Sequence, residues 1–388
     1  MIDGVAELED LGEVSGRSVL VRTDFNVPLA AEQITDDLRI RAALPTLNWL
    51  VERGAKVTAC SHLGRPKGEP NPAYSLDPVR TRLAALAPDV SLMENLRFDP
   101  GEEGNDPAFT QKLIAGHDLF VNDAFGASHR AHASIVGPPD YLPSAAGRLL
   151  ASEVKILFGL REQPRRPFVA VMGGAKVSDK LGVIESLLGI VDALIVGGGM
   201  AFTFLAARGH PVGSSLLEQD MVETCGRLLS GGSTIYLPED ITALGPGGKL
   251  FEPEAGGEVR QVGASIPEGW MGVDIGPGTA AVFGDVILDA GTVLWNGPMG
   301  VFEDPRFAAG TRAVAEAIAE TKAFTVVGGG DSAAAAKQFG VDQDVDHVST
   351  GGGAALELIE QGDLPGLAAL RRSAKRSASP PSNHADGA

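Results

Sequence analysis

The chain of 388 residues is poor in cysteine and in long apolar runs, and both shortages exclude classes of protein. Its two cysteines, Cys60 and Cys225, lie far apart in apolar surroundings and form no CxxC motif, so we expect buried free thiols in a reducing compartment. The longest uncharged run, residues 193–207, contains three glycines and is too short to span a membrane. The acidic N-terminus MIDGVAELEDLGEV lacks the apolar stretch of a signal peptide. These features predict a cytoplasmic protein without a membrane partner.

Basic residues are also scarce, since 32 Lys and Arg stand against 50 Asp and Glu, for a net charge of -18. This balance argues against a general affinity for nucleic acid, because phosphate backbones attract cationic surfaces. Any local cluster of Arg, Lys and His therefore stands out. The even acidity gives no sign of an interface, so we expect a monomer. Glycine is abundant instead, at 50 residues, which predicts many tight turns or loops lined by backbone.

Short apolar runs alternate with helix-like segments along most of the chain. This alternation predicts βαβ units and parallel sheets that are covered on both faces. The chain is 44% apolar and can bury two cores, and its strands are too many for one comfortable sheet. We therefore expect an α/β protein of two doubly wound domains. The predicted strands are residues 18–22, 55–60, 118–122, 168–172, 192–196, 233–237, 292–296 and 323–327.

Two further segments organise the chain around these strands. Residues 142–167 start near a Pro-Ser pair and end in Gln-Pro-Arg-Arg-Pro, and their centre predicts a long amphipathic helix that joins the domains. Residues 371–388 have almost no apolar content, which predicts a disordered tail. Its basic residues either meet an anionic partner or are simply solvated: Arg371, Arg372, Lys375 and Arg376.

Four glycine-rich stretches of the second half precede helical segments: MGGAK, VGGGM, VGGGD and STGGGA. Three of them follow a predicted strand, and the fourth follows only HVST. Backbone N–H groups at such helix starts bind anions. One such turn is weak evidence, because any doubly wound sheet has several. Four in one half, one with paired lysines and one with an aspartate, predict a site for nucleotide phosphates.

The paired lysines are Lys176, which ends the first of these stretches, and Lys180, which lies four residues further along the chain. Like charges at this spacing repel on a helix, and the positive end of the helix dipole also disfavours cations. A polyphosphate between the two lysines would reverse both penalties, whereas the alternative is two solvated side chains. The stretch is neither a Walker A motif nor a G-x-G-x-x-G turn, so a phosphate site here lies outside both fingerprints.

Two acidic residues of the second half are candidates for ligand contacts. Asp331 follows three glycines, and Ser332 then opens a helix, so either residue can be a plain N-cap. The alternative is that Asp331 helps to hold Mg²⁺ on nucleotide phosphates, since magnesium takes one or two carboxylates plus phosphate oxygens. Residues 295–305 form a long non-periodic loop, in which Glu303 is a candidate for a sugar or base contact.

The first half carries a basic cluster in loops that follow predicted strands. Arginine matches carboxylate and phosphate groups in two-point fashion, so a small ligand with both groups suits this set. For each arginine alone, the alternative is a surface ion pair. Asp24 and Asn26 are candidates to accept a hydrogen bond from a hydroxyl group, and zinc is a poor alternative because a third ligand is lacking. The basic candidates are Arg39, His62, Arg65, Arg97, His129, Arg130 and His132.

Two anion sites on two domains predict phosphoryl transfer, with domain closure that excludes water. Ten stretches strengthen this prediction: RTDFNVP, ITDDLRIRAALPT, SHLGRPKG, ENLRF, NDAFGASHRAHAS, GGAKVSDK, WMGVDIGP, WNGPMGVFE, GGGDS and STGGGA. In this order they closely resemble the phosphoglycerate kinase family, over about residues 10–370. The resemblance implies reversible transfer of the acyl phosphate of 1,3-bisphosphoglycerate to ADP, giving 3-phosphoglycerate and ATP in glycolysis.

The resemblance also implies a domain plan with two Rossmann-like domains joined by a hinge helix. Residues 1–148, together with a returning segment 364–372, would form the N-terminal domain that binds phosphoglycerate. Residues 149–363 would bind Mg-ADP or Mg-ATP, and residues 373–388 would be a disordered tail.

The family's site residues carry over to matching positions of this chain. Arg39 and Lys176 would bracket the transferring phosphoryl group, aided by backbone N–H groups near Gly351 and Gly352, and Asp331 would lie near Mg²⁺. The phosphoglycerate site would consist of Asp24, Asn26, Arg39, His62, Arg65, Arg97 and Arg130. The nucleotide site would consist of Lys176, Lys180, Gly272, Asn296, Glu303, Gly329, Gly330, Asp331 and Ser332.

The chain departs from the family pattern in a few places. LDPVRTRLAALAPD and VSLMENLRF are nearly fused, where the family has a further helix and strand, so we expect a smaller N-terminal domain. Gly278 stands where a lysine is expected. The alternative function is a non-catalytic nucleotide-binding protein on the same fold. That alternative predicts the loss of Arg39, Lys176 or Asp331, and all three are present.

Overall fold

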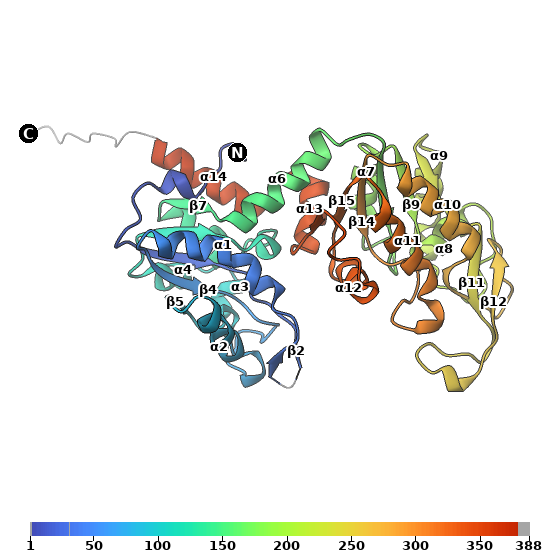
Figure 1. The fold of residues 1–388 in the computed structure, drawn as a ribbon, viewed down its shortest axis with the longest axis horizontal. Coiled ribbons are helices and arrows are strands. Elements are labelled where there is room, and N and C mark those ends of the chain that lie inside the picture. The colour runs from blue at the N-terminus through green and yellow to red at the C-terminus, as the bar shows by residue number, and fades with distance from the viewer. Residues whose placement is uncertain (1, 31, 379–388) are drawn as a thin grey trace, which may run out of the picture. The chain divides into compact units, whose positions relative to one another are not determined.

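The computed structural model describes residues 2–30 and 32–378 and divides into two compact units. The first consists of the described residues of Met1–Phe158 and Gln361–Ala388, and the second is Gly159–Glu360 (Figure 1). The sequence placed these limits at 148/149 and 363/364. The first limit lies instead inside helix α6 (Arg148–Glu162), which starts in one unit and ends in the other.

The N-terminal unit is built on five parallel strands in the order β5-β4-β1-β6-β7. The chain runs outward from β1 through β4 to β5 and then continues on the other side of β1. Loops after β1 and β6 therefore meet at the switch point where open α/β sheets bind ligands. The strands are β1 (Ser18–Arg22), β4 (Lys56–Cys60), β5 (Val90–Leu92), β6 (Leu119–Asn122) and β7 (Ser144–Ala146).

Burial of β1 on both faces explains why this sheet forms. Val19 and Val21 pack with α1 and α2 residues on one face, whereas Leu20 packs with α4 residues on the other. Both faces are thus buried, as expected for parallel strands rich in β-branched residues. The helices of this unit are α1 (Leu38–Glu52), α2 (Asp77–Leu86), α3 (Pro100–Glu103), α4 (Pro107–Ile114), α5 (Ala133–Val136) and α14 (Pro365–Ala378). Short 3-10 helices are η1 (Leu8–Leu11), η2 (Pro72–Tyr74), η3 (Leu96–Phe98), η4 (Phe125–Ala127) and η5 (Pro138–Asp140).

The C-terminal unit repeats this plan with six parallel strands, in the order β10-β9-β8-β14-β15-β16. Its switch point lies between β8 and β14. The strands are β8 (Phe168–Met172), β9 (Ala193–Val196), β10 (Thr234–Tyr236), β14 (Thr292–Asn296), β15 (Phe324–Val327) and β16 (His347–Val348). The helices are α7 (Leu181–Leu188), α8 (Met200–Ala207), α9 (Val222–Ser230), α10 (Pro277–Leu288), α11 (Ala309–Glu320), α12 (Gly330–Phe339) and α13 (Gly353–Gln361), with η6 (Gln219–Met221), η7 (Pro253–Ala255) and η8 (Pro305–Phe307).

The core of the C-terminal unit explains the apolar runs of the second half. Val171 and Trp295 lie on one face of the sheet, in a cluster with residues of α10, α11 and α12. Ala170 and Leu294, which point to the other face, are also buried. The sheet is therefore covered on both sides, as the alternation of strands and helices predicted.

All eight predicted strands are present, which confirms two doubly wound parallel sheets. The sequence missed the short β5, β7 and β16. It also missed the antiparallel sheet β12-β11-β13, made of β11 (Asp240–Leu244), β12 (Val259–Gly263) and β13 (Met271–Ile275), and the hairpin of β2 (Leu29–Ala30) and β3 (Gln33–Ile34). Both cysteines are buried free thiols, as predicted. Within the described chain no helix has the length and apolarity needed to cross a membrane.

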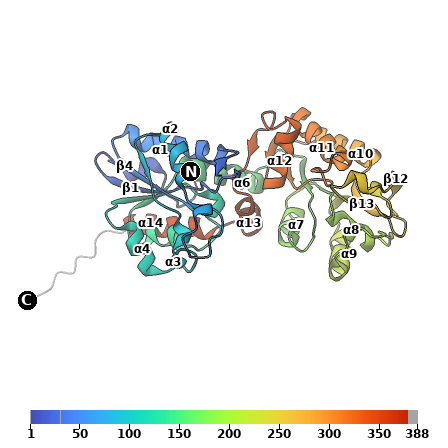
Figure 2. The same ribbon diagram turned by 90° about the horizontal axis from the view of Figure 1, so that it is seen from below.

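Helix α14 corrects the prediction of a disordered tail that begins at residue 373. It continues to Ala378 and packs against α5, η5 and β7 of its own unit (Figure 1, Figure 2). Ser373 is fully buried, and Arg376 donates to the carbonyl oxygens of Asp140, at 2.8 Å, and Pro139, at 2.7 Å. The basic residues thus cap carbonyls of η5, which composition alone could not show. The rest of the predicted tail, residues 379–388, lies outside the described residues.

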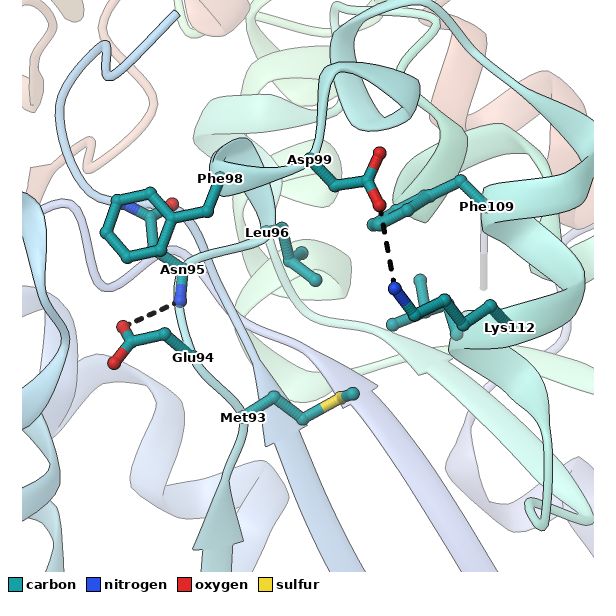
Figure 3. Close-up of a pocket in the computed structure, with 9 residues that line it drawn as sticks. Met93, Glu94, Asn95, Leu96, Phe98, Asp99, Phe109 and Lys112 are labelled. Carbon is teal, nitrogen blue, oxygen red and sulfur yellow. Dashed lines mark hydrogen bonds and ion pairs between the residues drawn. The ribbon is translucent and has the colours of Figure 1, made fainter. Parts of the chain in front are cut away.

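The N-terminal unit has a short connection before its edge strand, as predicted, and a cavity just after that strand. Helix α2 ends at Leu86, and β5 starts at Val90 and forms the edge of the sheet. A cavity of about 320 Å³ lies beside it (Figure 3). Asp99 and Lys112 form an ion pair at its rim, 3.7 Å apart. The lining residues are Met93, Glu94, Asn95, Leu96, Phe98, Asp99, Phe109, Lys112 and Leu113.

Candidate active site

The candidate residues of the N-terminal unit follow four neighbouring strands. Asp24 and Asn26 follow β1, and His62 and Arg65 follow β4. Arg97 lies in η3 after β5. Arg130 and the other two histidines follow β6, and Arg39 lies in the first turn of α1. Because the carboxyl ends of parallel strands meet at one edge of the sheet, one edge carries the whole predicted set.

Asp24 is the buried acidic member of this set. Its Oδ2 accepts a hydrogen bond from Arg39 Nη1 at 2.7 Å, and its Oδ1 accepts one from the Asn26 N–H at 3.3 Å. Burial opposes ionisation of Asp24, but the charges of Arg39 and Arg22, together with the hydrogen bond from the Asn26 N–H, outweigh it and hold its pKa below the usual value. Asp24 therefore stays ionised and orients Arg39, whose side chain remains 31% exposed toward a ligand.

The other arginines differ in how the protein holds them. Arg97 is buried, donates from Nη1 to the Gly64 carbonyl at 2.8 Å and pairs with Glu103 at 3.2 Å. The ion pair with Glu103 is made by Nε, which is buried and whose N–H is not aligned on the carboxylate. Arg130 donates from Nε to His129 Nε2 at 3.1 Å. Arg65 is exposed and makes no side-chain hydrogen bond or ion pair with any described residue. These unmet donors are suited to an anionic ligand.

The three histidines of the set are neutral near pH 7. Burial is the main cause in each case, and neighbouring arginines add to it, so every one of their pKa values is lowered. The pKa of His132 falls to about 4. These residues therefore contribute as neutral hydrogen-bonding groups, and the positive charge of the site belongs to its arginines.

A buried network that sequence reasoning missed supports these residues. Arg22, at the end of β1, and Glu102, in α3, are both fully buried, and Arg22 Nη2 lies 3.7 Å from Glu102 Oε1. Ser134 bridges them, since its Oγ lies 2.8 Å from Arg22 Nε and 2.6 Å from Glu102 Oε1. The one sequence signal for Arg22 is its place at the start of the RTDFNVP stretch. Nothing in the sequence marked Glu102, because its partners are 32 and 80 residues away.

The glycine loops of the C-terminal unit lie at the carboxyl edge of its sheet. Each of the four predicted stretches does connect a parallel strand to a helix: β8 to α7, β9 to α8, β15 to α12, and β16 to α13. The loops pack backbone against backbone, and this requires glycine. A Cβ on Gly198, whose φ is +66°, would lie 2.6 Å from the Gly174 nitrogen. A Cβ on Gly329, whose φ is +95°, would lie 2.9 Å from Asn296 Nδ2.

The two lysines of the GGAKVSDK stretch have different environments. Helix α7 begins only at Leu181, so Lys176 precedes it and Lys180 is its N-cap. Lys180 Nζ donates to the Gly173 carbonyl and to Asn296 Oδ1, each at 2.6 Å. Burial lowers its pKa to about 8, against the opposing charges of Asp331 and Asp179. Lys176 is exposed and makes no hydrogen bond or ion pair with another described residue, so its ammonium is available to a ligand.

Glu218, which the sequence did not mark, fixes the loop that carries Lys176. Its carboxylate accepts hydrogen bonds from the Val177 N–H at 2.6 Å and from the N–H and hydroxyl groups of Ser178. Burial raises the pKa of Glu218, but these hydrogen bonds and the charge of Lys176 outweigh it and lower the pKa overall. The carboxylate therefore stays ionised and holds in place the loop after β8, which carries Lys176.

Asn296 and Ser332 tie neighbouring loops together. Asn296 Nδ2 donates to the Gly328 carbonyl at 2.7 Å while its Oδ1 accepts from Lys180. Ser332 Oγ accepts from the Gly297 N–H at 2.6 Å, so it joins the loops after β14 and β15 instead of capping α12. Both side chains are buried and are already bonded to the protein. Their contribution to the site is the shape of the loops.

The remaining candidates of the C-terminal unit are spread over several loops. Asp331 is exposed in the first turn of α12, beside Gly330, and Glu303 is exposed before η8. Gly272 lies in β13, and its N–H donates to Ser215 Oγ at 2.8 Å. Gly351 and Gly352 precede α13, and the N–H of Gly351 donates to Ser349 Oγ at 3.1 Å. Among the described residues no group of three or more His, Cys, Asp or Glu could by itself hold a metal.

Comparison with known proteins gives matches to one family. A family model described as phosphoglycerate kinase matches residues 8–91 and 86–362, two segments that meet at the shortened connection before β5. A phosphoglycerate kinase of Rubrobacter xylanophilus is 52% identical over 92% of this chain and 96% of its own length. One of Salinispora arenicola is 54% identical over 94% and 99%. The solved structure of phosphoglycerate kinase from Coxiella burnetii has 36% identity and a TM-score of 0.86, and covers 95% of this chain and 100% of that one.

Two doubly wound units, one with a basic edge and one with a glycine-lined edge, define a nucleotide-dependent phosphotransferase. The relatives belong to a type of phosphotransferase in which a carboxyl group accepts the phosphoryl group. The chain belongs to the phosphoglycerate kinase family, a family of glycolytic enzymes. This membership favours the enzyme over the alternative of a non-catalytic nucleotide-binding protein.

Proposed function

We propose that the N-terminal unit binds the phosphoglycerate and the C-terminal unit binds Mg-ADP or Mg-ATP, in a cytoplasmic monomer. The observation that carries this division is the contrast between the two sheet edges. One edge gathers arginines around a buried, ionised Asp24, and the other gathers glycine turns with the exposed Lys176 and the exposed Asp331. The first suits a small acid with hydroxyl and phosphate groups, and the second suits a polyphosphate.

Each residue then has a role that its environment supports. Arg39, oriented by Asp24, and Lys176, at the end of the loop that Glu218 fixes, stabilise charge on the transferring phosphoryl group. No general base is needed, because the acceptor is already an anionic oxygen. Arg65, Arg97 and Arg130 bind the anionic ends of the phosphoglycerate. The N–H group of Gly352 assists as a further donor, while Gly351, whose N–H is bonded to Ser349 Oγ, fixes the loop that carries it.

Magnesium is part of this proposal, and the residues present fit it. Mg²⁺ takes one or two protein carboxylates and completes its shell with phosphate oxygens and water. Asp331 offers one exposed carboxylate at the start of α12. Its charge acts on Lys180 of the neighbouring loop by opposing the fall in the pKa of that lysine. When bound, the metal neutralises charge on the nucleotide phosphates. Glu303 and Gly272 contact the nucleoside, while Gly329 and Gly330 leave room for the phosphates.

Equilibrium binding to two matched variants tests the division. Arg65 and Lys176 are both exposed cations that make no hydrogen bond or ion pair within the described chain, so neither alanine variant should unfold the protein. We expect Arg65→Ala to weaken 3-phosphoglycerate binding by about tenfold or more and to leave ADP binding unchanged. Lys176→Ala should weaken ADP binding alone. A variant that weakens the other ligand, or neither ligand, contradicts the division.

Turnover tests separately whether Arg39 and Lys176 stabilise charge on the transferring phosphoryl group. Arg39→Ala and Lys176→Ala should each lower kcat by roughly 10²–10³-fold, the size of losing one preorganised donor to developing charge. Circular dichroism and unfolding curves should show that both variants keep their fold. Turnover close to that of the unmodified enzyme in both variants would refute this role of Arg39 and Lys176.

A further inference from the structure

Four buried side chains of the N-terminal unit form one continuous chain of hydrogen bonds. They run from Glu102 through Ser134 and Arg22 to His62, and none is more than 6% exposed. Ser134 Oγ lies 2.6 Å from Glu102 Oε1 and 2.8 Å from Arg22 Nε, and Arg22 Nη2 lies 3.2 Å from His62 Nδ1. Buried polar groups must find partners within the protein, so these bonds are not readily exchanged for water.

The chemistry of the groups fixes the direction of every bond. A guanidinium only donates, so the Ser134 hydroxyl accepts from Arg22. The same hydroxyl then donates to Glu102, whose other oxygen accepts from the Ser134 N–H at 2.9 Å. At the far end, His62 Nδ1 must also accept from Arg22. A neutral imidazole that accepts at Nδ1 carries its proton on Nε2.

His62 is neutral in this environment. Burial holds its pKa well below the usual value, and Arg22, Arg97 and Arg39 add to the effect against the single opposing charge of Asp24. No described residue hydrogen-bonds to Nε2 of His62. The Nε2–H group is therefore left to donate to whatever enters the basic edge of the sheet.

The geometry points to Glu102 as a positioning residue for the phosphoglycerate site, because it fixes, through Ser134 and Arg22, which ring nitrogen of His62 carries the proton. This inference rests on the proposed function of that site. Glu102 compensates the charge of Arg22 in a fully buried environment and orients the Ser134 hydroxyl. Without that carboxylate, Arg22 is a buried charge with no counterion at this contact, and His62 Nδ1 loses a fixed donor.

The unmodified enzyme gives the first test, which needs no variant to fold. Two-bond proton–nitrogen spectra of protein labelled with ¹⁵N-histidine report the tautomer of each of the seven histidines, and His62→Gln identifies the signals of His62. We expect His62 to be the neutral Nε2–H tautomer at pH 7. An Nδ1–H tautomer or an imidazolium overturns the inference. An Nε2–H tautomer in an enzyme that does not bind 3-phosphoglycerate overturns the proposed function and leaves the tautomer standing.

The second test changes Glu102 and compares it with another buried carboxylate. Glu102→Gln should convert His62 to a mixture of tautomers and raise KM for 3-phosphoglycerate by about tenfold, with KM for ATP changed less than about twofold. Asp274→Asn, in the C-terminal unit, also replaces a buried carboxyl group by an amide and should leave the His62 signals unchanged. Should Glu102→Gln fail to fold, Ser134→Ala keeps both charges and should show the same change in tautomer. Unchanged His62 signals in the folded variant, or equal rises in both KM values, overturn the inference.

Discussion

At the scale of single residues, the environment of each charged group decides its role more than its type does. Lys176 and Lys180 lie four apart in one stretch, yet only Lys180 is bonded to protein acceptors. The repulsion expected between two lysines on one helix does not arise, because Lys176 precedes α7. Lys180 is therefore explained by its hydrogen bonds within the protein. Lys176 is explained by the nucleotide that we propose it binds.

This difference predicts different outcomes for two matched substitutions. Lys180→Met removes an ammonium that joins the Gly173 carbonyl to Asn296, so it should destabilise the C-terminal unit by roughly 1–3 kcal/mol and weaken ADP binding. Lys176→Met should weaken ADP binding with no loss of stability. Urea unfolding, followed by fluorescence in a Trp49→Phe background, reports only this unit, because the other two tryptophans lie within it. Equal stability of the two variants would contradict the structural role of Lys180.

The same unit contains a buried carboxylate that makes stability depend on pH. Burial raises the pKa of Asp274 to about 7, against hydrogen bonds from the Gly310 and Ile275 N–H groups. A raised pKa in the folded state gives stability that is present near pH 4 and is lost as pH rises through about 7. Asp274→Asn should flatten this dependence by up to about 1.4 kcal/mol per pH unit between pH 4 and 7. Unfolding curves for both proteins that stay parallel over this range would disprove the effect.

At the scale of elements, long periodic segments were predictable, and short or buried polar features were not. The eight apolar runs all became strands, because burial on both faces leaves a continuous signal in the sequence. Strands such as β7 and β16 have two or three residues, too few to show a period. Antiparallel β12 is largely exposed and carries no apolar run.

The candidate residues also divide into those that the sequence could predict and those that only the structure reveals. Asp24, His62, Arg97 and the glycine turns lie in loops after strands, which order along the chain predicts. Glu102 and Glu218 act through partners that are distant in sequence, so only the folded chain reveals them. Composition misled at residue 373, since the basic residues of α14 bind carbonyl oxygens instead of water.

Helix α14 offers a matched pair of arginines one turn apart. Arg376 donates to carbonyl oxygens of Asp140, Pro139 and Leu142, whereas Arg372 forms a half-exposed ion pair with Asp140. Arg376→Ala should destabilise the N-terminal unit by about 1 kcal/mol, because the carbonyls lose their donor. Arg372→Ala should change stability by a few tenths of a kcal/mol at most, as exposed ion pairs contribute little. Thermal unfolding of the two variants makes the comparison, and the reverse order would contradict the account of α14.

At the scale of the whole molecule, each unit has its own sheet and its own ligand edge, and helix α6 runs from one unit into the other. Phosphoryl transfer needs both ligands together and needs water to be excluded from the reacting group. We therefore predict that binding of both ligands brings the units together. Solution X-ray scattering should show a smaller radius of gyration with 3-phosphoglycerate and a nucleotide than without them, and either ligand alone serves as the control. An unchanged radius with both ligands bound would count against closure.

The measurement that tests the central claim most directly is ATP consumption in the presence of 3-phosphoglycerate and Mg²⁺, coupled to reduction of the bisphosphoglycerate product. The account predicts turnover that requires all three components and that falls to background when any one of them is omitted. Absence of turnover in folded protein that still binds ADP would contradict the account and would favour a nucleotide-binding protein without catalysis.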